Sequence, residues 1–269
     1  MLEKLFRLDN KVIVITGAAG LLGQRHAEVV ACYGGIPILL DLSQQAVDNL
    51  ADKLNSKYKV NAMGFAVDIT NEESIKDNAE VVFKKFSKID GLVNNAANNP
   101  KVEDNDKVNF SRLENFPLDI WNDDINIGLT GSFLCAKYYG YKISQNPNGG
   151  SIVNISSDLG LIAPDQRLYK KDSLADNLQN VKPITYSVVK TGLIGFTRYL
   201  ATYWADKNVR CNAMCPGGVE NGQSKDFLNK IHSRIPMDRL AKPNEYQGSL
   251  LWMLSDASSY LNGAVISVD

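Results

Sequence analysis

Short apolar runs alternate with longer stretches of helical periodicity along the whole 269-residue chain. Each short run is the length of a buried strand. The predicted strands are Val12–Thr16, Ile36–Asp41, Asn61–Val67, Gly91–Asn94, Ser151–Ile155, Val209–Cys215 and Ala264–Val268. Strands that alternate with helices in this way indicate βαβ units and a parallel sheet.

The longer stretches carry apolar residues near helical spacing. The predicted helices are Leu22–Tyr33, Ser43–Tyr58, Glu72–Phe86, Leu118–Ser144, Thr185–Asp206 and Asn244–Leu254. Right-handed crossovers place such helices on both faces of the sheet. We therefore expect one Rossmann-like, doubly wound α/β domain of about seven strands over residues 1–269. Residues 97–115 and 158–183 show neither strand nor helix periodicity, and loops of that length are usually lids or binding loops.

The first strand runs directly into a glycine-rich turn and then a helix, which is the context that a dinucleotide-binding turn requires. Gly17 allows a tight turn, Gly20 lets the backbone approach a pyrophosphate, and Gly23 lets the helix pack closely on the strand. Leu21 and Leu22 lie in the same turn. The alternative is a purely structural turn.

Two carboxylates end neighbouring strands. Asp41 closes the second strand without a basic residue after it, so it can accept hydrogen bonds from a ribose diol and repels a 2′-phosphate. This favours NAD(H), with NADP(H) as the alternative. Asp68, followed by Ile69, is placed to meet the adenine edge, although either Asp could instead cap a helix or lie in a loop.

The fourth strand ends in Asn94 and Asn95, followed by Ala96 and Ala97, at the expected switch point of the sheet. Two adjacent amides there can join neighbouring strands and support a cofactor ribose. An Asn pair by itself is most often a turn.

Tyr186 and Lys190 lie one turn apart on a predicted helix, so both can act on one small volume. A free tyrosine is too weakly acidic to serve as a base at neutral pH, and a nearby ammonium favours the phenolate. Lowering its pKa by about 3 units corresponds to roughly 4 kcal/mol. Ser156 and Ser157 end the preceding strand, where a hydroxyl can hydrogen-bond a reacting oxygen.

The order of these motifs resembles that of the short-chain dehydrogenase/reductase family over practically the whole chain. The resemblance implies that Tyr186 is the general acid/base. It implies that Lys190 lowers the pKa of Tyr186 and binds the nicotinamide ribose. It also selects Ser157 over Ser156 as the catalytic serine. The residues that match the cofactor-binding motifs of the family further along the chain are Asn94, Asn95, Ala96, Pro216 and Gly217, with Val219 near the carboxamide.

Three features depart from the family pattern. Leu21 stands where the middle glycine of the turn is expected. The family's catalytic Asn in the long helix falls on Gly128, and Asn126, two positions earlier, is expected to face elsewhere. A main-chain carbonyl at that bend could still hold a relay water. The chain also stops at Asp269, where the family continues into Gly-Gly, which suggests a truncated C-terminus.

The segment 158–183 is longer than the family's usual spacing between the catalytic serine and tyrosine, so we expect it to form a substrate wall. Its polar groups and those after the Asn pair suit a hydroxyl-rich or anionic molecule better than a steroid or acyl chain. The expected contacts are Asn98, Arg167 and Tyr169, with Asn99, Lys101, Asp165, Gln166, Lys170 and Lys171 nearby. The alternative is an ordinary solvated loop. Residues 129–131, 163–169 and 216–223 look like those of a bacterial flagellin-modification and gluconate-5-dehydrogenase-like subgroup.

The composition of the chain argues against several classes of binding partner. The net charge is −1, with no block of basic residues, which argues against nucleic acid. We expect no membrane span, because no apolar run is long enough, and the chain start lacks a signal-peptide pattern. Four cysteines and two histidines lack zinc-site spacing and fit reduced thiols in the cytoplasm, so no metal is expected. The resemblance implies a homodimer or homotetramer assembled through the two long helices and the C-terminal segment.

Three functions follow from these observations. The first is an NAD(H)-dependent oxidoreductase that interconverts a secondary alcohol and a ketone on a sugar, sugar acid or sugar phosphate. The second is an NADPH-dependent ketoacyl-type reductase, against which Asp41 argues. The third is a catalytically silent dinucleotide-binding protein, suggested by Gly128 and the irregular glycine spacing, against which the intact Ser157, Tyr186 and Lys190 argue.

Overall fold

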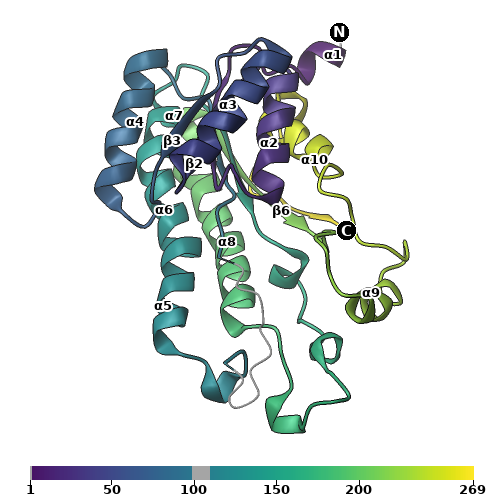
Figure 1. Ribbon diagram of the computed structural model, residues 1–269. Coiled ribbons are helices and arrows are strands. Elements are labelled where there is room, and N and C mark those ends of the chain that lie inside the picture. The colour runs from purple at the N-terminus through teal and green to yellow at the C-terminus, as the bar shows by residue number, and fades with distance from the viewer. Residues whose placement is uncertain (1, 99–109) are drawn as a thin grey trace.

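The computed structural model describes residues 2–98 and 110–269, and within these residues seven parallel strands form one sheet (Figure 1). The strands are β1 (Val12–Thr16), β2 (Ile36–Asp41), β3 (Met63–Ala66), β4 (Gly91–Asn94), β5 (Gly150–Ile155), β6 (Val209–Pro216) and β7 (Val265–Val268). Their order in the sheet is β3-β2-β1-β4-β5-β6-β7. The chain reverses direction across the sheet between β3 and β4, which creates a switch point beside β1. The predicted fold class is confirmed.

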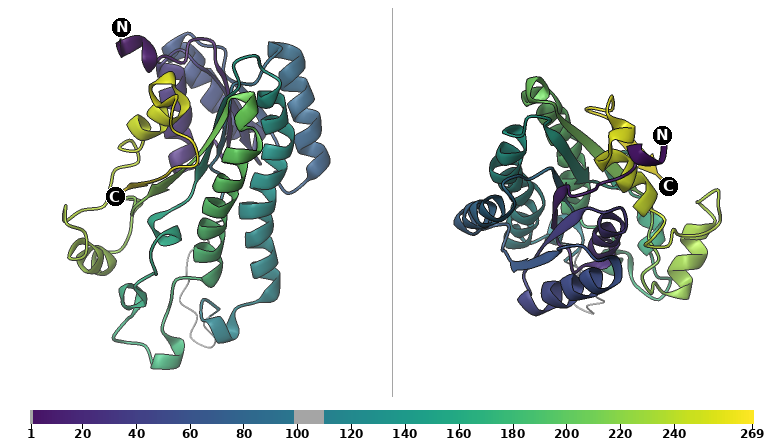
Figure 2. Two further views of the ribbon diagram at one scale, coloured as in Figure 1. Left: turned by 180° about the vertical axis from the view of Figure 1, so that it is seen from behind. Right: turned by 90° about the horizontal axis from the view of Figure 1, so that it is seen from above.

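Helices cover both faces of the sheet (Figure 2). One face is covered by α2 (Leu21–Cys32), α3 (Gln44–Tyr58) and α10 (Gln247–Leu254), and the other by α4 (Glu72–Phe86), the helical segment 118–144 and α8 (Ile184–Tyr203). Side chains alternate along a strand, so Ile13 and Ile15 of β1 join the first apolar cluster while Val12 and Val14 join the second. Two apolar layers therefore hold the sheet between them.

The structure differs from the sequence prediction mainly in the helices. The predicted helix 118–144 is helical throughout, but it consists of α5 (Leu118–Ile125), the π-helical turn η2 (Asn126–Thr130), α6 (Gly131–Cys135), a second π-helical turn η3 (Ala136–Gly140) and α7 (Tyr141–Ser144). The final predicted helix begins at Gln247 rather than at Asn244. The helices α1 (Leu2–Leu5) and α9 (Lys225–His232) were not predicted, since both are too short to show a sustained helical period and neither contains a fully buried residue.

A buried row of polar side chains ties the centre of the sheet to α8. The Nδ2 group of Asn94 donates to Oδ1 of Asn154 at 2.8 Å, and Nδ2 of Asn154 donates to Oγ1 of Thr197 at 2.8 Å. Buried polar groups are stable only when they are hydrogen-bonded, so this row fixes α8 relative to β4 and β5. The same helix carries Tyr186 and Lys190 at its first turns.

The insertion 158–183 forms no strand and contains the three short 3₁₀ turns η4 (Asp158–Gly160), η5 (Gln166–Tyr169) and η6 (Asp176–Leu178). It extends beyond the carboxyl ends of the strands, on the same side of the molecule as α9 (Figure 1). Within the described part of the chain, no helix combines the length and the apolar character needed to cross a bilayer.

His26 of α2 is completely buried, and neither ring nitrogen has a hydrogen-bond partner. Burial lowers the pKa of His26 from 6.5 to about 4. A charged imidazole is therefore disfavoured in the folded protein but free to form in the unfolded chain.

We predict that this histidine makes the protein acid-sensitive. Its contribution is complete above pH 6.5 and is lost as the pH falls towards 4, because the unfolded state takes up the proton first; the loss is about 3 kcal/mol. Urea unfolding is measured between pH 7 and pH 4, a range that spans both pKa values of His26. The free energy of unfolding of His26→Leu should depend less steeply on pH than that of the wild type. His232→Leu, at the other histidine, is the control, and identical slopes for wild type and His26→Leu would contradict the prediction.

Candidate functional site

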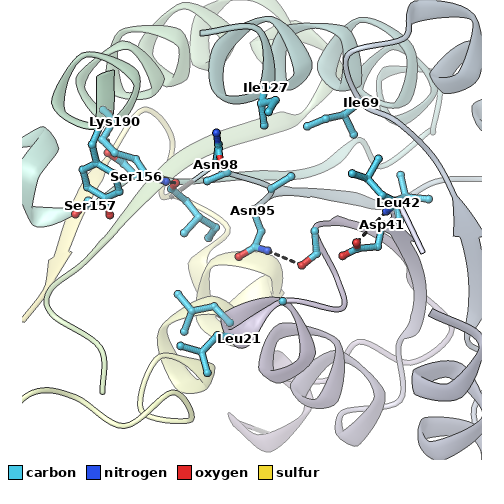
Figure 3. Close-up of a pocket in the computed structure, with 18 of the residues that line it drawn as sticks. Leu21, Asp41, Leu42, Ile69, Asn95, Asn98, Ile127, Ser156, Ser157 and Lys190 are labelled. Carbon is cyan, nitrogen blue, oxygen red and sulfur yellow. Dashed lines mark hydrogen bonds between the residues drawn. The ribbon is translucent and has the colours of Figure 1, made fainter. Parts of the chain in front are cut away.

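A cleft of about 720 Å³ opens at the carboxyl ends of the central strands. Asp41 and Leu42 lie at one end of it, and Ser157 and Lys190 lie at the other (Figure 3). The predicted site residues that line this cleft are Gly17, Gly20, Leu21, Leu22, Asp41, Asp68, Ile69, Asn95, Ala96, Ala97, Asn98, Ser157, Tyr186, Lys190, Pro216 and Gly217. The sequence therefore located one continuous surface from separate segments of the chain.

The glycine turn has no room for larger residues at two positions. Gly17 has a positive φ of 61°, and a Cβ atom there would lie 2.8 Å from Cα of Ala96. A Cβ atom on Gly23, which does not line the cleft, would lie 2.1 Å from the carbonyl oxygen of Gly17. The turn thus brings the N-terminus of α2 and its free backbone amides to the cleft, an arrangement that suits a pyrophosphate. Leu21, in place of the expected glycine, is the first residue of α2 and is partly exposed.

Backbone groups hold Asp41 in place. Its Oδ2 accepts a hydrogen bond from the amide of Ala19 at 2.9 Å, and its Oδ1 accepts one from the amide of Leu42 at 2.8 Å. Among the described residues that line the cleft, Lys190 is the only cation, and it lies at the opposite end. The end that holds Asp41 is therefore anionic, as a site for an unphosphorylated ribose should be.

Asp68 and Asn95 both stabilise the chain around the cleft. Asp68 accepts from the amide and the hydroxyl of Thr70 at 2.8 and 2.7 Å, so it combines the capping role with a place in the cleft wall. Nδ2 of Asn95 donates to the carbonyls of Thr16 and Gly17 at 2.9 and 3.1 Å. Asn95 therefore joins β4 to the glycine turn, as the sequence predicted for this pair of amides.

The two serines at the end of β5 have different partners. The Oγ of Ser156 donates to the main-chain carbonyl of Lys190 at 2.7 Å, so Ser156 holds α8 in place. The Oγ of Ser157 donates to Asp158 at 2.6 Å, and Ser157 lies close enough to Tyr186 to oppose the rise in the pKa of its phenol. The buried Nζ of Lys190 donates to the carbonyl of Ile155 at 2.8 Å. Geometry therefore places Ser157, rather than Ser156, beside Tyr186.

The pKa of Tyr186 moves in the direction opposite to the one expected from sequence. Burial raises the pKa of Tyr186, a hydrogen bond with Ser157 opposes the rise, and Asp158 adds to it. Burial also lowers the pKa of Lys190 to about 8, with a further contribution from Lys182. The expected net lowering of the Tyr186 pKa is not seen, because desolvation of the phenolate outweighs the hydrogen bond that favours it.

Several known proteins are similar to this chain over nearly its whole length. A family model described as enoyl-(acyl carrier protein) reductase matches residues 17–269. The chain is 32% identical over 267 residues to a 3-oxoacyl-(acyl-carrier-protein) reductase of Aquifex aeolicus, covering 98% of this chain and 97% of that protein. It is 28% identical to the post-translational flagellin modification protein A of Campylobacter coli over 262 residues, covering 97% and 98%. This chain belongs to the short-chain dehydrogenase/reductase family.

Two further members of this family are similar over nearly their full length. The NAD-dependent glycerol dehydrogenase of Listeria innocua is 28% identical over 275 residues, covering 99% of this chain and 95% of that protein. The crystal structure of a gluconate 5-dehydrogenase from Burkholderia cenocepacia, in complex with NADP and tartrate, superposes with a TM-score of 0.84 at 22% identity, covering 100% and 97%. The structural likeness shows the common fold, and the predicted family is confirmed.

This short-chain dehydrogenase/reductase has a tight helix contact where the family Asn is expected. Gly128 lies in the π-helical turn η2, and a Cβ atom there would lie 2.3 Å from Cγ1 of Val189 in α8. Its carbonyl accepts a hydrogen bond from Oγ of Ser132 at 2.8 Å. Asn126 lines the main cleft, which the sequence did not indicate, whereas Gly128 lines a smaller cavity next to Lys190.

The predicted substrate residues lie in different places. Asn98 lines both cavities and donates from Nδ2 to the buried carboxylate of Asp124 at 2.7 Å. The side chain of Arg167 is 76% exposed, pairs with Asp165 at 2.8 Å and does not line the cleft. The ring of Tyr169 packs 5.9 Å from that of Phe227 in α9. Asn99 and Lys101 lie outside the described residues.

Tyr169 nevertheless lies close to the catalytic group. Burial raises its pKa to about 12, and the neighbouring Tyr186 and Asp158 contribute to that rise. Val219 does not line the cleft either; its backbone pairs with Ala241, just beyond the lining residues Pro216 and Gly217.

Contacts between the insertion and α9 were not predicted. Asp165 pairs with Arg234 at 2.8 Å, in addition to Arg167. The Nζ of Lys230 donates to the carbonyl of Lys170 at 2.7 Å. Together with the Tyr169–Phe227 ring contact, these bonds join two segments that are far apart in the sequence. No local spacing signals them, because α9 itself was not predicted.

Proposed function

We propose that this protein is an NAD(H)-dependent oxidoreductase that interconverts a secondary alcohol and a ketone on a polar small molecule, such as a sugar, sugar acid or sugar phosphate. One observation carries the proposal: Ser157, Tyr186 and Lys190 converge at one end of a cleft whose other end holds Asp41. The cleft is large enough for a dinucleotide and a small substrate side by side.

Each catalytic side chain has a distinct role. Tyr186 exchanges the proton of the substrate hydroxyl, and Ser157 hydrogen-bonds the same oxygen as its negative charge develops. Lys190 binds the sugar next to the reactive ring and supplies positive charge behind Tyr186. When bound, a nicotinamide dinucleotide supplies the acceptor or donor of the hydride. In alcohol oxidation the carbon loses a hydride and the oxygen loses a proton to Tyr186.

The raised pKa of Tyr186 favours its protonated form at neutral pH, which is the form that donates a proton during ketone reduction. Alcohol oxidation needs the phenolate and therefore increases at alkaline pH.

The substrate wall supports a polar substrate. Asn98 lines the cleft and the smaller cavity beside Tyr186, and its amide can hydrogen-bond a hydroxyl or acid group. Tyr169 of the insertion lies near Tyr186 and brings a second polar group. The relative from Listeria innocua is named for action on glycerol, a polyol. An NADPH-dependent ketoacyl-type reductase is the second candidate, favoured by the 32% identity to the Aquifex aeolicus enzyme.

We further propose a cytoplasmic location. All four cysteines are free, three of them buried, which suits a reducing compartment.

We predict that Tyr186→Phe abolishes turnover because no other group at this position exchanges the proton. Turnover of glycerol, xylitol, gluconate and 6-phosphogluconate with NAD⁺ is followed by NADH absorbance, and the rate should fall by at least about a thousandfold. Binding of NADH, followed by fluorescence, should persist. Tyr260→Phe, at a fully exposed ring that does not line the cleft, is the matched control, and turnover retained by Tyr186→Phe would refute the catalytic assignment. Binding of NADH by a wild type that turns over none of these compounds or acetoacetyl thioesters would favour the silent binding protein.

We predict that Asp41 determines the preference for NADH. Asp41→Asn keeps an oxygen to accept the amide bonds but removes the charge, so the affinity ratio of NADPH to NADH should rise by on the order of tenfold, about 1.4 kcal/mol. Calorimetric titration of both cofactors measures this ratio. Asp68→Asn, in the same cleft, is the control. A wild-type protein that prefers NADPH would instead favour the ketoacyl-type reductase.

We also propose a homodimer or homotetramer built on the two long helical segments. Phe133, Tyr141, Tyr199 and Tyr203 leave large aromatic surfaces exposed along 118–144 and α8. Tyr199→Glu should therefore shift the protein towards monomer in light scattering, since a charge is costly in an apolar interface. Tyr260→Glu, at an exposed ring away from these helices, should not. A wild type that is monomeric at micromolar concentration would refute this assembly.

A further inference from the structure

A second lysine lies against the ring of Tyr186. The Nζ of Lys182 is 3.7 Å from the centroid of this ring, compared with 5.7 Å for the Nζ of Lys190. An ammonium over the face of an aromatic ring is attracted by the negative charge of the π system. Lys182 is therefore the closer of the two cations to the ring of the proposed acid/base.

A small cavity next to Gly128 lies beside both lysines. A cavity of about 10 Å³, the size of one water molecule, is lined by Lys182, Lys190, Tyr186, Gly128 and Asp124, among others. Lys182 also lines an outer groove of about 370 Å³. It thus spans from the catalytic group to a surface groove through which protons can exchange with water.

The backbone around Lys182 is fixed. Its amide donates to Oε1 of Gln166 in η5 at 2.7 Å, and the following residue, Pro183, is buried at the start of α8. The restricted φ of proline limits the conformations of this junction. The side chain therefore starts from a defined position next to Tyr186.

Charged and titratable groups from each neighbouring element face this pair. They are Asp158 from η4, Tyr169 from η5, Asp124 from α5, Cys215 from β6 and Lys190 from α8. Burial lowers the pKa of Lys182 to about 8, and Asp158 opposes this fall. Lys182 in turn lowers the pKa of Lys190, so the two ammonium groups sense each other at close range.

We propose, on the basis of the function proposed above, that Lys182 is a positioning residue of the catalytic site, which holds the ring of Tyr186 by its face and supplies a second positive charge that favours the phenolate. It acts through Tyr186 and touches neither the reacting carbon nor its oxygen. This role belongs to the present chain because it depends on a lysine that the insertion delivers and on the space beside Gly128.

Removing the positive charge of Lys182 affects proton binding at Tyr186 and at Lys190 in the same direction. Loss of a nearby cation strengthens proton binding at the remaining groups, so Lys190 keeps its proton to higher pH. At neutral pH, where Lys182 carries its proton, the fraction of Tyr186 present as phenolate then falls, and alcohol oxidation slows. A merely structural lysine would change the amount of folded protein but would not produce a shift graded by charge.

The test uses a series of variants graded in charge: Lys182→Arg, Lys182→Met and Lys182→Glu in the full chain. NMR of tyrosine labelled at Cζ measures the titration midpoint of Tyr186, whose signal is identified by its loss in Tyr186→Phe. Because the pKa of Lys182 is about 8, this side chain has lost its proton before the phenol of Tyr186 ionises. We therefore expect a midpoint lower by on the order of one pH unit for Arg, which stays charged, little change for Met, and a higher midpoint for Glu. This measurement needs neither substrate nor bound cofactor, and far-ultraviolet circular dichroism verifies folding of each variant.

A second readout is the pH profile of kcat/KM for the first of glycerol, xylitol or gluconate that the wild type oxidises. At pH 7, where Lys182 carries its proton, kcat/KM should fall by on the order of tenfold in Lys182→Met and be retained in Lys182→Arg. Lys207→Met removes the same charge from an exposed position beyond the C-terminal end of α8 and should leave both readouts unchanged.

The outcomes separate the two proposals. Equal midpoints in Lys182→Arg, Lys182→Met and Lys182→Glu, or an equal loss of kcat/KM at pH 7 in Lys182→Arg and Lys182→Met, would overturn the role of Lys182. If Lys182→Glu does not fold, the Arg and Met variants decide the question alone. Turnover retained by Tyr186→Phe would instead refute the proposed function, whatever the titration of Tyr186 shows.

Discussion

Two reciprocal hydrogen bonds between β5 and α8 determine where the reactive groups lie. The side chain of Lys190 donates to the backbone of Ile155, and the side chain of Ser156 donates to the backbone of Lys190. Each bond is buried, so breaking either would leave a polar group without a partner. The long insertion between Ser157 and Tyr186 can therefore vary in conformation while these two residues stay together, because strand and helix are joined directly.

The close approach of the helices has a second effect on the site. Gly128 lets the π-helical turn of 126–130 press against Val189, and the space left beside Lys190 is small and enclosed. Enclosure explains why burial dominates the pKa of Tyr186 and Lys190 alike. The positive charge near the phenol then depends on which further cations reach the same enclosure, and among the described residues that line it Lys182 does so.

Much of the fold follows from the sequence because burial leaves regular patterns. The strand and helix periodicities located the sheet, and the residues that end its strands gave Asp41, Asn95 and Ser157. The position of Lys182 beside Tyr186 was not predicted, because Lys182 precedes the first helical residue, Ile184, and helical spacing does not apply to it. The pKa directions depend on desolvation, which a linear pattern does not measure. Arg167 was predicted to contact the substrate, but it pairs with Asp165, which also binds Arg234. No local pattern in the sequence indicates the contact between Asp165 and Arg234.

The carboxylate of Asp165 binds guanidinium groups from its own segment and from the region after α9. The insertion and the α9 region therefore behave as one structural module, although more than 40 residues lie between Asp165 and Lys225. A chimaera that received only one of the two from a relative would leave Arg234 without its counter-ion or Asp165 with only one of its two. Substrate preference could be transplanted between relatives only if both segments were moved together.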